Sequence, residues 1–161
     1  KELILHSSEG IFFIDKNILT NGIDTINFYK ILVSKTSSEH AGEPGINGKF
    51  RILTSSTKVI GPGEVCTHSY FTIGIFKNKS EANNALSYLK TKFVRFLMLL
   101  AMSSINLSKL VFIFIPIQDF SEAWTDEKLY SKYGLTEEEI AFIESMIRPM
   151  ELNGDSNEEE K

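Results

Sequence analysis

Residues 78–103 read NKSEANNALSYLKTKFVRFLMLLAMS and carry the clearest helical pattern in the chain. Asn78 and Glu81 have the spacing of a capping box at a helix start. The apolar residues that follow recur at steps of three and four, which is typical of one buried helix face: Ala82, Ala85, Leu86, Leu89, Phe93, Phe96, Leu97 and Leu100. The pattern predicts one long helix over residues 79–103.

Short runs rich in β-branched and aromatic residues surround this helix and predict strands. The expected strands are Glu2–Ser7 and Ile11–Ile14 (an opening hairpin), Tyr29–Val33, Phe50–Leu53, Val65–Phe76 and Leu110–Ile115. Strands followed by helices favour an α+β fold. We therefore expect a mostly antiparallel sheet packed by the long helix, with a small helical C-terminal end.

The C-terminal part carries two further helix signals. Thr125 and Gly134 bracket a short helix as N-cap and C-terminal stop. Thr136 and Glu139 form a second capping box, and Pro149 ends the helix that it begins. We expect one domain over residues 1–150, with 121–150 as a helical subdomain in one alternative, and a disordered acidic tail over 151–161.

Length and composition suit one globular domain, because 161 residues with 42% hydrophobic content can form one core. The only cysteine is Cys66, so no disulfide can form within the chain, and a reducing cytoplasm is the expected location. No apolar run is long enough to cross a bilayer, and no signal peptide begins the chain. The first residue is Lys1 rather than Met, which fits a domain cut from a longer protein.

The charged residues are distributed unevenly along the chain. Residues 1–120 carry 13 Lys and Arg against 9 Asp and Glu, whereas residues 121–161 carry 4 against 12. A polyanion would be repelled by the second part and tolerated by the first. A solvated acidic tail on a neutral domain explains the same numbers, and both interpretations stay open.

Motifs for catalysis and cofactor binding are missing from the sequence. No metal-ligand spacing, phosphate-binding loop, dinucleotide fingerprint or nucleophile elbow occurs. Cys66 and His68 are two residues apart on an expected strand and would share a face, as a Cys–His pair could. The favoured interpretation is a small core cysteine with His68 as a neighbour on that face, so no catalytic residue, cofactor site or metal site is expected.

Basic residues near an aperiodic loop over residues 36–49 give the remaining signal. Loops of this length inside a compact domain are often functional. Cations can hold phosphates, and neighbouring loop residues can reach base edges. The candidate DNA contacts are Lys30, Lys35, His40, Lys49, Arg51 and Lys58 near the loop, and Lys90 and Lys92 on the long helix. Ordinary solvated lysines are the alternative.

Several long segments resemble one known family. They are Glu64–Gly74, Leu89–Leu97, Ile113–Phe120, Trp124–Tyr130 and Lys132–Glu144. Together they resemble the C-terminal part of bacterial restriction–modification methylases, and of fused restriction enzymes, that act on adenine. The resemblance covers residues 25–150 except 36–62, where a sequence-reading loop would differ between members.

This resemblance implies that catalysis and target recognition belong to different parts of the parent enzyme. In such enzymes an upstream domain binds S-adenosylmethionine and carries an Asn-Pro-Pro-aromatic motif, which does not occur here, and neither does a nuclease motif. The chain would then correspond to the target-recognition region, non-catalytic by itself. Its expected partners are double-stranded DNA and the upstream catalytic domain, with no membrane. The reading surface is expected on the 36–62 loops, away from the acidic C-terminal helices.

Two other functions stay open. The chain could be a docking or structural module of the same enzyme, acting through its apolar helix. It could also be a small enzyme that uses Cys66 and His68, which is the least favoured hypothesis.

Overall fold

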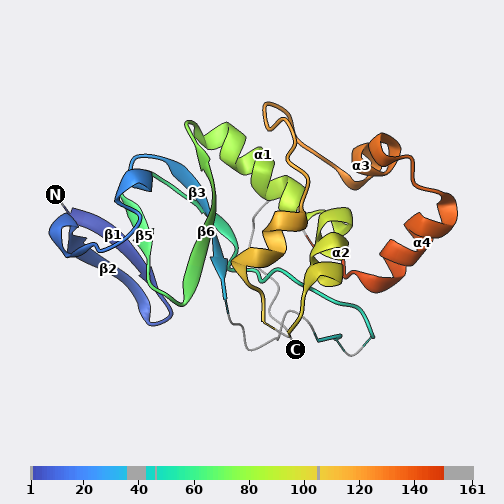
Figure 1. Ribbon diagram of the computed structural model, residues 1–161, viewed down its shortest axis with the longest axis horizontal. Coiled ribbons are helices and arrows are strands. Elements are labelled where there is room, and N and C mark those ends of the chain that lie inside the picture. Colours follow the sequence, from blue (N-terminus) through green and yellow to red (C-terminus); the bar gives the residue numbers. More distant parts are fainter. Residues whose placement is uncertain (1, 36–42, 46, 105, 151–161) are drawn as a thin grey trace.

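The computed structural model describes residues 2–35, 43–45, 47–104 and 106–150, and it has the expected α+β fold. Two three-stranded sheets and a group of helices follow one another along the long axis (Figure 1). The expected acidic tail, 151–161, lies outside the described residues. The elements are β1 (Glu2–Ser7), β2 (Gly10–Asp15), η1 (Lys16–Ile18), η2 (Ile23–Thr25), β3 (Tyr29–Ser34), β4 (Lys58–Ile60), β5 (Glu64–Cys66), β6 (Tyr70–Phe76), α1 (Lys79–Lys90), α2 (Lys92–Ala101), η3 (Lys109–Phe114), α3 (Asp126–Tyr133) and α4 (Glu137–Met146).

The first sheet has the strand order β2-β1-β5 and contains the expected opening hairpin. β1 pairs with β2 antiparallel and with β5 parallel. His6 on β1 lies 2.6 Å from Glu64 on β5, and Glu64 also accepts a hydrogen bond from the Gly61 amide. The Glu64 side chain therefore fixes both the β1–β5 pair and the turn that leads into it.

The second sheet has the order β4-β3-β6, with both pairs antiparallel. Helix α1 contacts all three strands, and α2, α3 and α4 continue from it toward the other end of the molecule (Figure 1). One cluster of buried side chains runs from Ile31 on β3 through Tyr88 on α1 to Ile147 after α4. The C-terminal helices thus pack on the same core as the second sheet.

The expected single strand over Val65–Phe76 is wrong, because the segment divides between the two sheets. Residues 64–66 pair with β1, and residues 70–76 pair with β3. The connection is held at both ends, since the Thr67 amide donates to His6 and the Lys35 amide donates to Ser69.

The expected strand over Leu110–Ile115 is a 3₁₀ helix instead, η3. The amide of Val111 donates to Ser108, and that of Ile115 donates to Phe112, both over three residues. The Phe112 ring packs edge-on against Phe71 of β6, with centroids 5.7 Å apart. The apolar run did not distinguish strand from helix, and only part of it is packed, since Leu110, Ile113 and Phe114 are exposed.

The expected long helix over residues 79–103 is broken into α1 and α2 at Thr91. Thr91 has extended dihedral angles, φ −60° and ψ 152°, and its hydroxyl caps the Val94 amide. That hydroxyl also donates to the Tyr88 carbonyl over 2.7 Å. Thr91 is thus both the end of α1 and the N-cap of α2.

The first amides of α2 are bound by a residue far along the chain. The Asp126 carboxylate accepts hydrogen bonds from the amides of Lys92 at 3.1 Å and Phe93 at 2.8 Å. A carboxylate at a helix N-terminus satisfies amides that have no partner within the helix, and it complements the helix dipole. Burial raises the pKa of Asp126, and these two hydrogen bonds partly offset that effect.

No helix in the described part of the chain is long and apolar enough to span a membrane.

Replacing Asp126 should destabilise the protein through α2. We expect Asp126→Ala to lower the free energy of unfolding by about 2 kcal/mol, because two charge-assisted hydrogen bonds are lost. Asp126→Asn keeps one acceptor oxygen, so about half of that loss is expected. Urea unfolding monitored by circular dichroism measures both values.

The control is Asp119→Ala, since the exposed Asp119 also accepts a backbone hydrogen bond, from Ser121. Its loss should stay below about 0.5 kcal/mol. Equal losses for Asp126→Ala and Asp119→Ala would contradict the assigned role.

Candidate functional site

The segment where a strand was expected, Phe50–Leu53, makes a sharp turn. Ile52 has φ 72°, and among the described residues it is the only non-glycine with positive φ. The Leu53 amide donates to the Arg51 carbonyl over 3.0 Å, which closes a three-residue γ-turn around Ile52. A β-branched residue in this conformation is strained, by about 1–3 kcal/mol, and persists only where its surroundings hold it.

The Arg95 side chain holds this turn from α2. It is 1% exposed. Its Nη1 donates to the Arg51 carbonyl over 3.2 Å, and its Nε donates to the carbonyls of Lys90 and Thr91 over 2.9 and 3.3 Å. One guanidinium therefore joins the γ-turn to the break between α1 and α2, and we call this set of contacts the Arg95 clasp.

The clasp requires a charged Arg95 guanidinium, whereas burial disfavours the charged form. Burial lowers the pKa of Arg95 to about 10, with Asp126 acting in the opposite direction and Arg51 and Arg148 adding to the decrease. The group nevertheless stays protonated at neutral pH. The positive charge inside the protein is thus compensated by carbonyl oxygens and by the Asp126 carboxylate.

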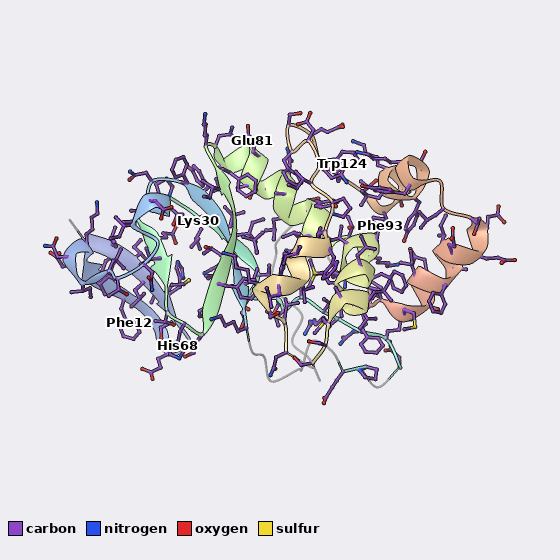
Figure 2. The ribbon with its side chains drawn as sticks, in the orientation of Figure 1. Phe12, Lys30, His68, Glu81, Phe93 and Trp124 are labelled. Atoms are coloured by element: carbon purple, nitrogen blue, oxygen red, sulfur yellow. The ribbon has the colours of Figure 1, made fainter. Side chains whose placement is uncertain are left out.

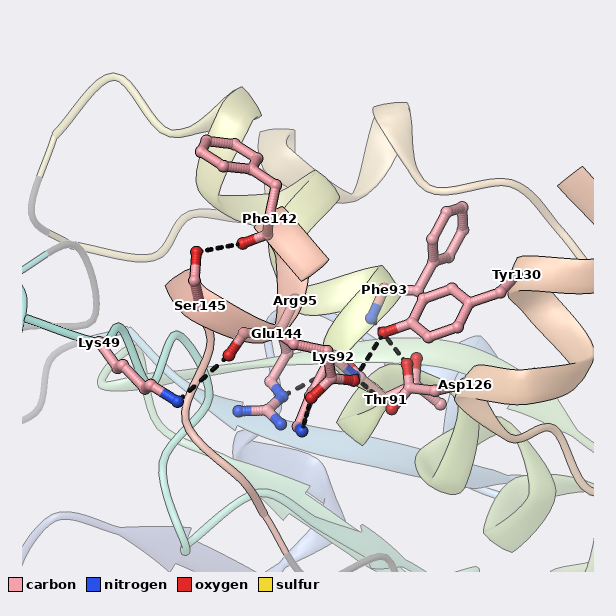
Figure 3. Close-up of polar contacts among 10 residues, drawn as sticks. All are labelled: Lys49, Thr91, Lys92, Phe93, Arg95, Asp126, Tyr130, Phe142, Glu144 and Ser145. Atoms are coloured by element: carbon pink, nitrogen blue, oxygen red, sulfur yellow. Dashed lines mark hydrogen bonds and ion pairs between the residues drawn. The ribbon is translucent and has the colours of Figure 1, made fainter. Parts of the chain in front are cut away.

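The γ-turn directs the preceding residues toward the end of α4. The Phe50 amide donates to Met146 over 2.8 Å, and the Arg148 amide donates to Phe50 over 2.9 Å. Lys49 Nζ reaches the Glu144 carbonyl over 3.2 Å (Figure 3). The loop base and the C-terminal helix therefore lie together, contrary to the expectation that the reading loops lie away from the acidic helices.

Five basic side chains gather where these segments meet. Arg51 and Arg148 are close enough to Arg95 to shift its pKa, and Lys92 forms an ion pair with Glu144. We call the set the cation cluster: Lys49, Arg51, Lys92, Arg95 and Arg148. Among the described residues, Asp126 and Glu144 are carboxylates that contact or influence it.

Two of the candidate DNA contacts are buried. Lys30 is 2% exposed, and its ammonium donates to the carbonyls of Thr25 and Phe28 over 2.9 and 3.0 Å. Burial lowers its pKa, partly against the charge of Glu64. Lys90, at the end of α1, is 6% exposed. In this structure neither side chain is on the surface where a phosphate could reach it (Figure 2 labels Lys30).

The remaining candidates fall into two places. Lys49, Arg51 and Lys92 belong to the cation cluster. Lys35 and Lys58 are exposed on the second sheet, Lys35 just after β3 and Lys58 on β4. His40 lies outside the described residues.

The Cys66–His68 pair does not share a strand face, because β5 ends at Cys66 and His68 is exposed in the connection that follows (Figure 2). Burial raises the pKa of the Cys66 thiol, although Lys35 and Lys30 act in the opposite direction. A nucleophilic thiolate needs a lowered pKa, so this geometry does not activate Cys66.

Metal-binding and catalytic sites have little support among the described residues. Among the described residues no group of three or more His, Cys, Asp or Glu could hold a metal ion. An open pocket of about 380 Å³ lies between α2 and α4, with edge-on rings of Phe96 and Phe142. Its lining is mainly apolar, and its two carboxylates, Glu138 and Glu139, lie in the first turn of α4, where the Glu139 side chain closes the capping box with Thr136.

Several members of this site could not be found from sequence patterns. Asp126 and Glu144 lie 34 and 52 residues from their partner Lys92. Arg148 follows Ile147, where the chain leaves α4 and bridges to Phe50. Only the tertiary fold brings these groups together, although a basic residue just beyond an acidic helix was a visible irregularity.

Comparison with protein-family models, curated proteins and solved structures finds no match to this chain.

Replacing Arg95 should weaken both segments that the clasp joins. We expect Arg95→Lys to lower the free energy of unfolding by about 2–4 kcal/mol, because an ammonium cannot serve carbonyls on both sides at once. The γ-turn should open before the rest of the chain unfolds. Urea unfolding measures the first effect, and limited proteolysis within residues 43–53 measures the second.

Lys128→Met is the control, because Lys128 pairs with Glu122 on the surface at 2.9 Å. It should change stability by no more than about 0.5 kcal/mol. An Arg95→Lys variant with wild-type stability and wild-type proteolysis would show that the clasp does not hold the turn.

Proposed function

We propose that this chain binds duplex DNA as the target-recognition part of an adenine-specific restriction–modification protein. The observation that carries the proposal is the convergence of the cation cluster at the base of the 43–53 segment. Cations on DNA-binding proteins fix register by contacting phosphates, while neighbouring residues read base edges. Here the phosphate contacts would come from Lys49, Arg51, Lys92 and Arg148.

The geometry supports this proposal in a second way. A recognition loop must present its side chains from a fixed base, since base contacts require defined distances. The Arg95 clasp and the bridge from Phe50 to α4 supply such a base. The resemblance supports it independently, because residues 36–62 are where family members would differ. Methyl transfer, with its S-adenosylmethionine, would belong to an upstream domain of the parent protein.

Removing two cations of the cluster should weaken DNA binding and its salt dependence. We expect Lys49→Ala/Arg148→Ala to lower affinity about tenfold or more at roughly 50 mM salt. The slope of log affinity against log salt should fall by about 2, one for each lost phosphate contact. Fluorescence anisotropy with a labelled duplex of about 24 base pairs, over a salt series, measures both.

Lys77→Ala/Lys79→Ala is the matched control, since it also removes two positive charges but at the exposed start of α1. Its affinity should stay within about twofold of wild type, on the general effect of net charge alone. If the wild-type chain showed no salt-dependent binding, or the two double variants lost affinity equally, the proposal would fail.

A second candidate function, docking to a protein surface, is favoured by one apolar patch. Leu110, Ile113, Phe114 and Ile117 on and after η3 are between 66% and 91% exposed, and Leu100 at the end of α2 is 68% exposed. Helices α2 and η3 contact each other. Large exposed apolar patches on a protein often mark surfaces that bind another molecule.

If this patch docks, the purified chain should associate through it. We expect a concentration-dependent increase in mass, by sedimentation velocity, that Ile113→Ser/Phe114→Ser abolishes without changing DNA affinity. The control is Ile11→Ser/Phe13→Ser, which alters residues of similar exposure on β2. Association that persists in the first variant, or disappears equally in the control, would count against docking through η3.

A further inference from the structure

The carboxylate of Glu144, in the last turn of α4, is bound by donors from two other helices, α2 and α3. Its Oε2 forms an ion pair with Lys92 at the start of α2, and its Oε1 accepts a hydrogen bond from the Tyr130 hydroxyl of α3 over 3.0 Å. Lys49 Nζ donates to its main-chain carbonyl over 3.2 Å. Figure 3 shows Lys92 and Tyr130 at the Glu144 carboxylate and Lys49 at the main-chain carbonyl of the same residue.

The surroundings of Glu144 favour a negative charge at this point. Burial opposes ionisation of the carboxyl, but the hydrogen bonds from Lys92 and Tyr130 and the charges of Lys92 and Lys49 outweigh it, and its pKa is lowered. Burial also raises the pKa of Tyr130, with the charges of Asp126 and Glu144 adding to it. The phenol therefore keeps its proton and remains a donor at neutral pH.

The same donors suit a phosphate oxygen. Ammonium groups and hydroxyls are common partners of DNA phosphates, and charge-assisted hydrogen bonds to carboxylates and phosphates have similar lengths. The Glu144 side chain is 39% exposed and that of Lys92 is 22% exposed, so the pair is accessible from solvent. A rotation of the Glu144 side chain would vacate the position without moving the helix.

We propose that Lys92 and the Tyr130 hydroxyl, with the charge of Lys49 close by, form a subsite for a backbone phosphate, which the Glu144 carboxylate occupies in the free protein. The inference rests on the proposed DNA-binding function. Glu144 acts as an internal competitor, since it must leave its partners before the phosphate can take its place. It keeps Lys92 oriented, and it lowers the affinity of every duplex equally because it contacts no base.

Glu144→Gln tests this competition. The amide keeps the shape of the side chain and can accept the Tyr130 hydrogen bond, but it carries no charge to hold Lys92. Affinity of the 161-residue chain for a labelled duplex should rise about five- to tenfold at roughly 50 mM salt, with a salt slope steeper by about 1. Adding Lys92→Ala to Glu144→Gln should abolish the gain.

Glu122→Gln is the matched control. Glu122 is also ion-paired with a lysine, Lys128, in the C-terminal part of the chain, but outside the cation cluster. Losing that charge should change affinity by less than about twofold. Thermal unfolding of each variant monitors folding, and Glu144→Ala, which should show the same gain, replaces Glu144→Gln if the latter does not fold.

The outcomes separate the two proposals. A wild-type chain that binds DNA with a salt slope, together with Glu144 variants that match it in affinity and slope, would overturn the competition and leave the DNA-binding function standing. Equal gains in Glu144→Gln and Glu122→Gln would also overturn it, because they would show a general charge effect. Absence of salt-dependent binding in wild type and all variants would overturn both.

Discussion

The Arg95 clasp is the contact on which the arrangement of the helical half depends. A γ-turn around Ile52 and a helix break at Thr91 are each unfavourable alone, since one is strained and the other leaves carbonyls without helical partners. A single buried guanidinium donates to both. Because its charge must be compensated in the interior, Asp126 is placed beside it, and that carboxylate in turn caps α2.

Local signals in the sequence predicted the parts of the fold that depend on local interactions. The helix starts at Asn78, Thr125 and Thr136 are capped as expected, and the opening hairpin forms. The break at Thr91 could not be predicted from periodicity, because apolar spacing continues unchanged across it. The amide of Lys92 after the break is bound by Asp126, 34 positions further along the chain, and no spacing rule connects the two.

The candidate site shows the same limit for charged residues. Lys30, Lys90 and Lys92 were all predicted as DNA contacts because they are lysines. The fold shows that their surroundings differ. Lys30 and Lys90 are buried, whereas Lys92 begins a helix and reaches a surface carboxylate. A lysine can satisfy main-chain carbonyls as well as it can satisfy a phosphate, so its role follows from burial rather than from composition.

The contacts that hold the loop base have a consequence for a DNA-reading role. Arg95 binds the carbonyl of Arg51, and Phe50 exchanges main-chain hydrogen bonds with Met146 and Arg148. Such contacts depend on the path of the backbone and little on the side chains that the loop carries. Under the proposed function, side chains of the loop could therefore change with the target sequence while the base stays in place. Ile52 is the exception, because its buried side chain and positive φ tie it to the turn itself.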